Sequence, residues 1–223
     1  TLEIIMKTVL ITGCSTGFGL ETARHFLDRD WHVIATMRNP HDCTLAPHER
    51  LTVLALDVTD PASIAATVAT AGPVDVLVNN AGITRDMLAM RLKDEDWDAV
   101  LDTNLKAVFR MSRAVIRPMM KQRYGRIISI TSVVGASGNP GQANYAAAKA
   151  GMNQMTKVMA YELSPKIRVN AIAPGAIETP STAFITQNET LLKNTTRWIP
   201  LKRLGQPDDI ALGALYLASP ASS

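Results

Sequence analysis

The feature of this sequence that most limits its fold is a regular alternation of short apolar runs with longer amphipathic stretches. Six runs are rich in Val and Ile and apolar almost throughout, which is typical of strands covered on both faces. Helical patterns lie between and after them, and this alternation predicts a parallel sheet with helices on both faces. The predicted strands are "TVLITG" (8–13), "WHVIATM" (31–37), "LTVLALDV" (51–58), "VDVLVNN" (74–80), "GRIISIT" (125–131) and "IRVNAIAPG" (167–175), and the predicted helices are 17–29, 61–71, 94–122, 143–163 and 207–218.

The fold class that follows is α/β, a Rossmann-type doubly wound parallel sheet in the order 3-2-1-4-5-6, within a single domain over 1–223. The stretch "LKDEDWDAV" is a suitable acidic start for the helix at 94–122, and Gly125 is predicted to end it. Two prolines within 39–50 leave room for at most a helical turn or two in that connection.

A glycine-rich turn, "TGCSTGFG" (12–19), follows the first predicted strand and opens the first helix. Glycine lets the backbone come close to a ligand, and the amides at a helix N-terminus favour an anion such as a pyrophosphate. Such a loop alone is also typical of a tight turn, but its place after the first strand favours a dinucleotide site. The residues of this predicted phosphate cradle are Gly13, Ser15, Thr16, Gly17, Phe18 and Gly19.

The end of the second strand selects between NAD and NADP in folds of this kind, because an acid there binds the ribose 2′-hydroxyl and an arginine accepts a 2′-phosphate. This chain has Arg38 at that place, in "ATMRNP". A solvated surface charge is the alternative interpretation of Arg38. We predict NADP (NADPH) as the cofactor.

Composition and charge exclude several classes of protein. An apolar content of 47% with 19% charged residues is that of a folded soluble protein, and a charge of +3 without a basic stripe predicts no nucleic-acid partner. The apolar runs are too short for a membrane span. Cys14 and Cys43 form no metal-ligand pattern, so no metal is predicted and a cytoplasmic setting is expected. Residues 1–5 precede Met6 and Lys7, which look like a natural start, so we expect these five residues to be an addition outside the fold.

One further motif, "NYAAAK" (144–149), places a phenol and an ammonium four residues apart on one face of a predicted helix. Together with "TGCSTGFG", "NNAG" (79–82), Asn104 in "DTNL", Ser132 in "TSVVG" and "PGAIET" (174–179), it resembles the short-chain dehydrogenase/reductases. The middle of the chain resembles bacterial 3-oxoacyl-[acyl-carrier-protein] reductases. The two ends are more similar to hydroxysteroid dehydrogenases, so a mosaic origin is left open.

The resemblance implies a catalytic set of four residues. Tyr145 would be the general acid/base, and Lys149 would lie beneath the nicotinamide ribose and lower the pKa of the phenol. Ser132 would bind the substrate oxygen beside Tyr145, and Asn104 would hold a water that links Lys149 to solvent. Taken singly, each of these residue types is common as a cap, a turn residue or a core side chain.

The resemblance also implies further cofactor contacts and a substrate lid. The carboxylate of Asp57 would lie near the adenine amino group, and residues 180–199 would cover an apolar substrate. The implied cofactor contacts beyond the glycine turn and Arg38 are Asp57, Val58, Asn79, Ala81, Gly82, Tyr145, Lys149, Pro174, Gly175, Ile177 and Thr179.

The function predicted from these residues is NADP(H)-dependent reduction of a ketone to a secondary alcohol, with a 3-oxoacyl thioester as substrate. Arg123, with Lys121 and Arg126, would receive an acidic acyl-carrier protein, although cations at a helix end also complement the helix dipole. A hydroxysteroid-type dehydrogenase is the second enzymatic interpretation. A dinucleotide-binding sensor or scaffold without catalysis is the third.

We also expect a homo-oligomer, a tetramer or a dimer. The helices at 94–122 and 143–163 carry more apolar residues than one sheet face can cover, and the family uses these helices as a subunit contact. The family's final strand, which ends in "TGxxxxVDGG", does not follow "SPASS" here, so either the terminus is truncated or the sheet has one strand fewer and an exposed edge. The apolar residues that suggest the contact are Val108, Met111, Ala147 and Met155.

Overall fold

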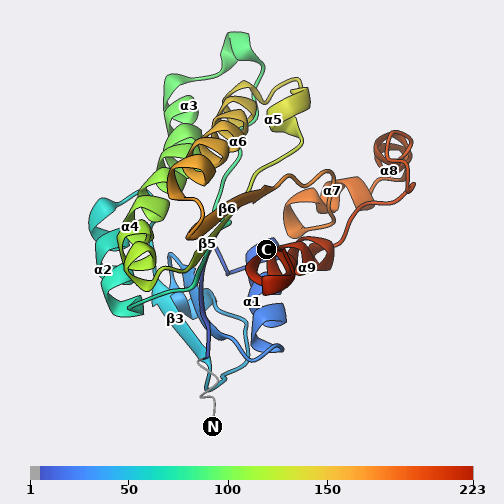
Figure 1. The fold of residues 1–223 in the computed structure, drawn as a ribbon. Coiled ribbons are helices and arrows are strands. Elements are labelled where there is room, and N and C mark those ends of the chain that lie inside the picture. The colour runs from blue at the N-terminus through green and yellow to red at the C-terminus, as the bar shows by residue number, and fades with distance from the viewer. Residues whose placement is uncertain (1–5, 223) are drawn as a thin grey trace.

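A computed structural model describes residues 6–222 of the chain, so the predicted addition at 1–5 lies outside the described residues. The described chain folds around one sheet of six parallel strands in the order β3-β2-β1-β4-β5-β6 (Figure 1). This order confirms the predicted doubly wound α/β fold. The strands are β1 (Thr8–Thr12), β2 (His32–Met37), β3 (Leu51–Ala55), β4 (Val76–Asn79), β5 (Gly125–Ile130) and β6 (Ile167–Ile172).

Alternate residues of the strands point to opposite faces of the sheet, and each face is covered by helices. Val9 and Ile11 of β1 belong to a cluster that includes Phe26 and Ala214, while Leu10 between them belongs to a second cluster on the other face. Figure 1 shows α1 and α9 on one side of the sheet and α2, α4 and α6 on the other. The helices are α1 (Gly17–Leu27), α2 (Pro61–Ala71), α3 (Asp94–Leu101), α4 (Ala107–Gln122), α5 (Val134–Ser137), α6 (Ala143–Leu163), α7 (Ala183–Thr186), α8 (Glu189–Thr196) and α9 (Pro207–Ala218).

The predicted helix at 94–122 is interrupted by a π-helical turn at Asp102–Lys106 between α3 and α4. A π turn adds a residue to one turn of a helix and so rotates the side chains that follow it. Asn104 lies in this turn and is completely buried. The regular apolar period of the sequence does not reveal such a local change.

Gly125 does not end the long helix, contrary to the prediction. Arg123 takes the left-handed conformation at the end of α4, with φ of 57°, and Gly125 is already the first residue of β5. A Cβ on Gly125 would lie 2.6 Å from the sulfur of Met119, so glycine is needed there for close packing of α4 on the sheet.

Several predicted strands end earlier than their apolar runs do. β3 stops at Ala55 and β6 at Ile172, so residues 56–58 and 173–175 are loop at the carboxyl edge of the sheet. The predicted turn at 39–50 contains a 3₁₀ turn at Pro40–Asp42, as its prolines allow. The apolar residues that follow the last paired residue of these strands are thus loop residues at the carboxyl edge of the sheet.

Residues 180–203, between β6 and α9, form an arm. A 3₁₀ turn at Pro180–Thr182, α7 and α8 extend away from the sheet in Figure 1 before the chain returns to α9. Within residues 6–222, β6 pairs only with β5, so its outer edge is open as expected. A search of the same residues finds no helix long and apolar enough to cross a membrane.

Candidate active site

The candidate site lies where the carboxyl ends of the strands meet, beginning with the glycine turn between β1 and α1. Gly13 and Gly17 have φ of 73° and 60°, a conformation that other residues rarely adopt. Thr16 precedes the helix, but its side chain makes no capping hydrogen bond, and the first turn of α1 carries no acidic residue. The first amides of α1 therefore lack a local side-chain acceptor, which fits the binding of a pyrophosphate at this helix end.

A neighbouring strand braces this turn through Asn80, a residue that the sequence prediction omits. The amide Nδ2 of Asn80 donates to the carbonyls of Thr12 (2.8 Å) and Gly13 (3.0 Å). The hydroxyl of Thr12 accepts from the backbone amides of Asn80 (2.9 Å) and Ala81 (3.0 Å). The signal in the sequence is the predicted strand order, which puts "NNAG" directly beside the glycine turn.

The other residues of "NNAG" have different positions. Asn79 is only 3% exposed, and its side chain donates to the hydroxyl of Ser112, with no described partner for its own oxygen. The side chain of Asn79 therefore lies between β4 and α4, and its contact with a cofactor stays a prediction. Gly82 is exposed, and a Cβ there would lie 3.1 Å from the side-chain oxygen of Asn104.

Arg38 and Asp57 lie beyond the carboxyl ends of β2 and β3, and both are exposed. The carboxylate of Asp57 accepts hydrogen bonds from the hydroxyl (2.7 Å) and the amide (2.8 Å) of Thr59. These bonds, with a smaller contribution from the positive charge of Arg38, lower the pKa of Asp57. Val58 is half-buried beside them. An exposed cation and a carboxylate thus lie at the carboxyl ends of two neighbouring strands.

Helix α6 carries Tyr145 and Lys149 toward the end of β5. The ammonium of Lys149 is 4% exposed, donates to the carbonyl of Ile130 (2.8 Å) and lies 5.5 Å from the centre of the Tyr145 ring. Ser132 follows β5, is 8% exposed and accepts a hydrogen bond from the amide of Val134 (3.1 Å). Gly135 lets α5 approach α6, because a Cβ there would lie 2.8 Å from the backbone nitrogen of Ala150.

The pKa of Tyr145 differs in direction from the sequence prediction. Burial raises the pKa of the phenol, the nearby Ser132 hydroxyl lowers it in part, and the charge of Asp86 raises it further. Burial also lowers the pKa of Lys149 to about 8. Desolvation is the largest effect on Tyr145 here, and the lowering of the phenol pKa by Lys149 together with a positive nicotinamide ring stays a prediction for the protein with its cofactor bound.

Asn104 makes two hydrogen bonds to one residue. Its side-chain oxygen accepts from the amide of Ile83 (2.8 Å), and its Nδ2 donates to the carbonyl of Ile83 (2.8 Å). The side chain is therefore bonded to the backbone that follows "NNAG", and the predicted role of Asn104 in holding a water stays a prediction. A second buried amide, Asn144, was also not predicted and accepts from the amide of Tyr145 (2.8 Å) while donating to the carbonyl of Arg85.

The segment after β6 completes the site. The carbonyl of Pro174 accepts from the amide of Val133, Gly175 is exposed, and buried Ile177 pairs with Gly205 in an isolated parallel bridge. Thr179 caps the 3₁₀ turn at the base of the arm through a reciprocal pair with Thr182. The predicted residues of 174–179 thus connect the carboxyl end of β6 to the arm.

Taken together, the geometry offers an anion-binding helix end, a proton donor beside a hydroxyl, and a buried ammonium on one side of the sheet edge. This is the arrangement needed for a dinucleotide cofactor with an acid/base residue at its reactive end. The family model for short chain dehydrogenase matches residues 7–190.

The chain belongs to the short-chain dehydrogenase family.

Curated relatives support the assignment over nearly the whole chain. The chain is 45% identical to the 3-oxoacyl-[acyl-carrier-protein] reductase of Vibrio harveyi, with 97% of this chain and 91% of the relative covered. It is 46% identical to the reductases of that name from Escherichia coli (96% and 90% covered) and Thermotoga maritima (97% and 92%). The likeness to these reductases therefore includes both ends, for which the sequence motifs favour hydroxysteroid dehydrogenases.

A solved structure shows the same fold. An oxidoreductase of the short-chain dehydrogenase/reductase family from Burkholderia thailandensis superposes with a TM-score of 0.90 at 33% identity, covering 97% of this chain and 87% of that one. The protein is accordingly an oxidoreductase of a family that acts on hydroxyl and keto groups with a nicotinamide dinucleotide.

Proposed function

We propose that this oxidoreductase reduces a 3-oxoacyl thioester to the 3-hydroxyacyl thioester with NADPH. The observation that carries the proposal is the Tyr145 phenol beside the Ser132 hydroxyl, because these two groups can bind one ketone oxygen and the phenol can donate its proton to it. Likeness of about 45% to reductases with that substrate in their names supports the substrate class. The test is Tyr145→Phe, which should lower kcat while leaving the affinity for NADPH nearly unchanged.

Four side chains of this protein would have separate roles in such a reduction. The nicotinamide, when bound, supplies the hydride. Ser132 and Tyr145 orient the ketone oxygen, and the phenol protonates that oxygen as its negative charge develops. Lys149 holds its ammonium next to the phenol and stabilises the phenolate that is left. Asn104 acts on this set from a distance, by holding the backbone of Ile83 just after "NNAG".

Arg38 supports NADPH as the cofactor rather than NADH. Its guanidinium is exposed at the end of β2, where a 2′-phosphate would be paired in this fold. Arg38→Asp should reverse the preference between the two cofactors, measured as the dissociation constants of NADPH and NADH by fluorescence titration. Equal affinity of the unaltered protein for both would contradict the proposal.

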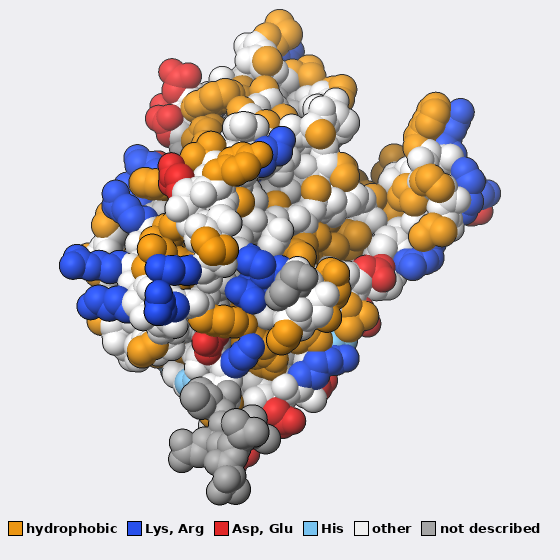
Figure 2. All heavy atoms as spheres, in the orientation of Figure 1, with side chains coloured by type: hydrophobic (Ala, Val, Ile, Leu, Met, Phe, Trp, Pro, Cys, Tyr) orange, Lys and Arg blue, Asp and Glu red, His pale blue; other side chains and the backbone are white. Residues whose placement is uncertain are grey.

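An acidic acyl-carrier protein is the proposed partner, and a basic surface supports it. Figure 2 shows Lys and Arg side chains gathered over α4 at the left of the view, and exposed members of this set are Arg117, Lys121 and Arg123. Arg126 does not belong to it, contrary to the sequence prediction. Its side chain is 8% exposed and stacks on Tyr124, with 4.5 Å from the guanidinium carbon to the ring centre.

We propose a homo-oligomer that associates through α4 and α6. Val108 and Met111, which suggested this contact in the sequence, are core residues. Exposed apolar side chains nonetheless lie on both helices: Phe109, Met120, Val158 and Tyr161. Association would bury them. Sedimentation that shows an active monomer at micromolar concentration would contradict this proposal.

We also propose a cytoplasmic setting for this protein. Cys14 and Cys43 are free thiols, which supports that setting.

The substrate class is tested by a steady-state assay with two kinds of ketone. We expect NADPH oxidation with a 3-oxoacyl thioester, with kcat/KM at least about tenfold above that for a ketosteroid of similar solubility. A preference for the ketosteroid would favour the hydroxysteroid-type dehydrogenase instead. Binding of NADPH with turnover of neither ketone would favour the sensor or scaffold.

A further inference from the structure

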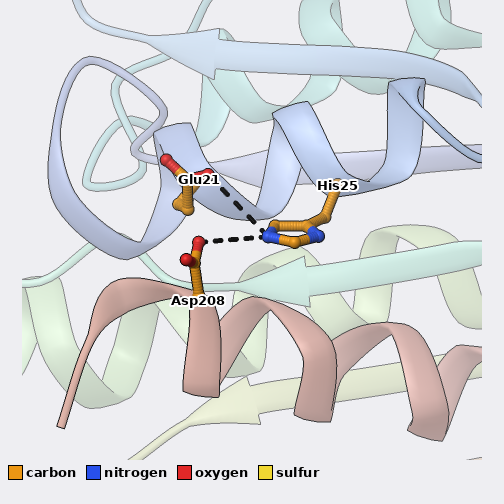
Figure 3. Close-up of side chains that lie close together, drawn as sticks. All are labelled: Glu21, His25 and Asp208. Carbon is orange, nitrogen blue, oxygen red and sulfur yellow. Dashed lines mark hydrogen bonds and ion pairs between the residues drawn. The ribbon is translucent and has the colours of Figure 1, made fainter.

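A cluster of three metal-ligating side chains lies outside the site described above, between α1 and α9 (Figure 3). The ring nitrogen Nε2 of His25 lies 3.1 Å from a carboxylate oxygen of Asp208 and 3.8 Å from one of Glu21. The three ligand atoms all lie within 4.8 Å of one another. Within residues 6–222 this is the one group of three such side chains that comes so close together.

The spacing of these atoms suits a tetrahedral zinc ion. Zinc bonds to nitrogen and oxygen at about 2.0–2.1 Å, which puts two tetrahedral ligand atoms roughly 3.3 Å apart. The observed 3.1 and 3.8 Å lie on either side of that value. An imidazole with two carboxylates suits zinc better than magnesium or calcium, which prefer oxygen ligands.

The way in which the elements present these ligands also favours a metal. Glu21 and His25 are four residues apart on α1, so their side chains share one face, and Figure 3 shows a nitrogen of the His25 ring facing both Glu21 and, on α9, Asp208. The His25 and Glu21 side chains are 19% and 24% exposed, and that of Asp208 is 60% exposed. An ion can therefore enter from solvent, where waters would complete its coordination.

Two cations compete with a metal at this place. Arg24 pairs with Glu21 at 3.2 Å, and a guanidinium nitrogen of Arg29 lies 3.4 Å from Nδ1 of His25. A donor at Nδ1 favours the tautomer with its hydrogen on Nε2, which points that hydrogen at the Asp208 carboxylate. Metal binding at Nε2 requires the hydrogen on Nδ1, so Arg29 opposes it both by charge and by tautomer.

We propose that Glu21, His25 and Asp208 form a structural zinc site that joins α1 to α9. Helix α1 begins at the glycine turn, and α9 begins where the chain returns from the arm at 177–206. A zinc ion bound here would tie the middle and last turn of α1 to the first turn of α9 and stabilise the folded chain by mass action. This inference is independent of the reaction proposed above.

The test is a titration of the protein, without a polyhistidine tag, with zinc chloride. We expect one saturable site by calorimetry and a rise of roughly 3–6 °C in the midpoint of thermal unfolding at saturating zinc. His25→Gln should weaken binding more than about tenfold, and Asp208→Asn should weaken it to a smaller extent. Arg29→Gln should strengthen it, because the competing cation is gone.

Two controls separate this site from unspecific binding. His41→Gln, on the exposed 3₁₀ turn at Pro40–Asp42, should bind zinc as the unaltered protein does. Magnesium chloride at the same concentration should leave the unfolding midpoint unchanged. Each variant is first compared in chelator, so that the zinc-dependent shift is measured apart from any loss of intrinsic stability. The proposal is wrong if the unaltered protein shows no saturable site, or if His25→Gln binds zinc equally well.

Discussion

Helix α6, which precedes β6, and the arm at 180–203, which follows β6, are held in opposite ways. Within α6, Asn144, Lys149 and Met152 are buried, and the Lys149 ammonium is bonded to the end of β5. In the arm, Phe184 is 61% exposed and Trp198 is 79% exposed. The arm's polar contacts are mostly local, such as the donation from Lys202 to the carbonyl of Arg197.

This difference in packing separates the residues proposed for proton transfer, on α6, from those proposed for substrate recognition, in the arm. Proton transfer needs atoms fixed to within a fraction of an ångström, which a helix packed on the sheet provides. Substrate recognition by apolar side chains tolerates movement, and elements with few buried contacts open at little free-energy cost. We therefore expect substitutions in α6 to change kcat and substitutions in the arm to change KM.

The largest effect is expected for Tyr145→Phe. This change removes the proton donor and keeps the ring, so kcat should fall by about 10²–10⁴-fold while the affinity for NADPH stays within about twofold. Tyr161→Phe on the same helix is the matched control, because that side chain is 86% exposed, and it should retain full activity. A Tyr145→Phe variant with most of its kcat would show that the acid is another group.

Lys149→Met should lower kcat by about 10²-fold or more and also change the pH dependence of stability. Burial lowers the pKa of Lys149 to about 8 from 10.5, so the unfolded chain binds more protons than the folded chain between these values. Stability of the unaltered protein should therefore gain from this group as pH rises from 8 to 10.5. The variant lacks that gain, so its stability relative to the unaltered protein should fall over the same range.

Denaturant unfolding without cofactor at several pH values measures this difference. Lys157→Met, at an exposed position two turns further along α6, should show no such change with pH. A parallel pH dependence in Lys149→Met and the unaltered protein would mean that Lys149 is not desolvated as the structure has it.

Asn104→Ala should have a smaller effect, mainly on stability. The change leaves the amide and carbonyl of Ile83 without their partner, at a cost of about 2–4 kcal/mol in the free energy of unfolding. Asn104→Asp keeps the acceptor but loses the donor. Its free energy of unfolding in urea should therefore lie between that of Asn104→Ala and that of the unaltered protein. If Asn104→Ala lowered kcat without lowering stability, the amide would act in the reaction and not in the framework.

Trp198→Ala should have the smallest effect on stability, below about 0.5 kcal/mol, because the side chain is mostly exposed. Its KM for a long 3-oxoacyl thioester should rise several-fold with kcat unchanged. Trp31→Ala is the contrast, since that ring packs edge-on against Phe26 with 5.1 Å between centres, and it should destabilise the fold far more. A large loss of stability in Trp198→Ala would remove the distinction between α6 and the arm.

The sequence by itself determined the framework of this protein. Apolar runs of strand length and the positions of glycine are local patterns, so they predicted the six strands, their order and the turn after β1. The spacing of Tyr145 and Lys149 put both on one helix by the same reasoning. The ends of the strands were less well predicted, because an apolar residue just beyond the last paired residue of a strand looks the same in the sequence as one within the strand.

Only the tertiary structure decided how the site residues are held. That Asn80 ties the glycine turn to β4, and that Asn104 bonds the backbone of Ile83, depends on segments far apart in the chain. Whether Arg126 faces solvent and whether the pKa of Tyr145 rises or falls depends on how much water the surrounding elements exclude. Hydrogen-bond partners and desolvation are properties of all the neighbours of a group at once, and the sequence around one residue does not contain them.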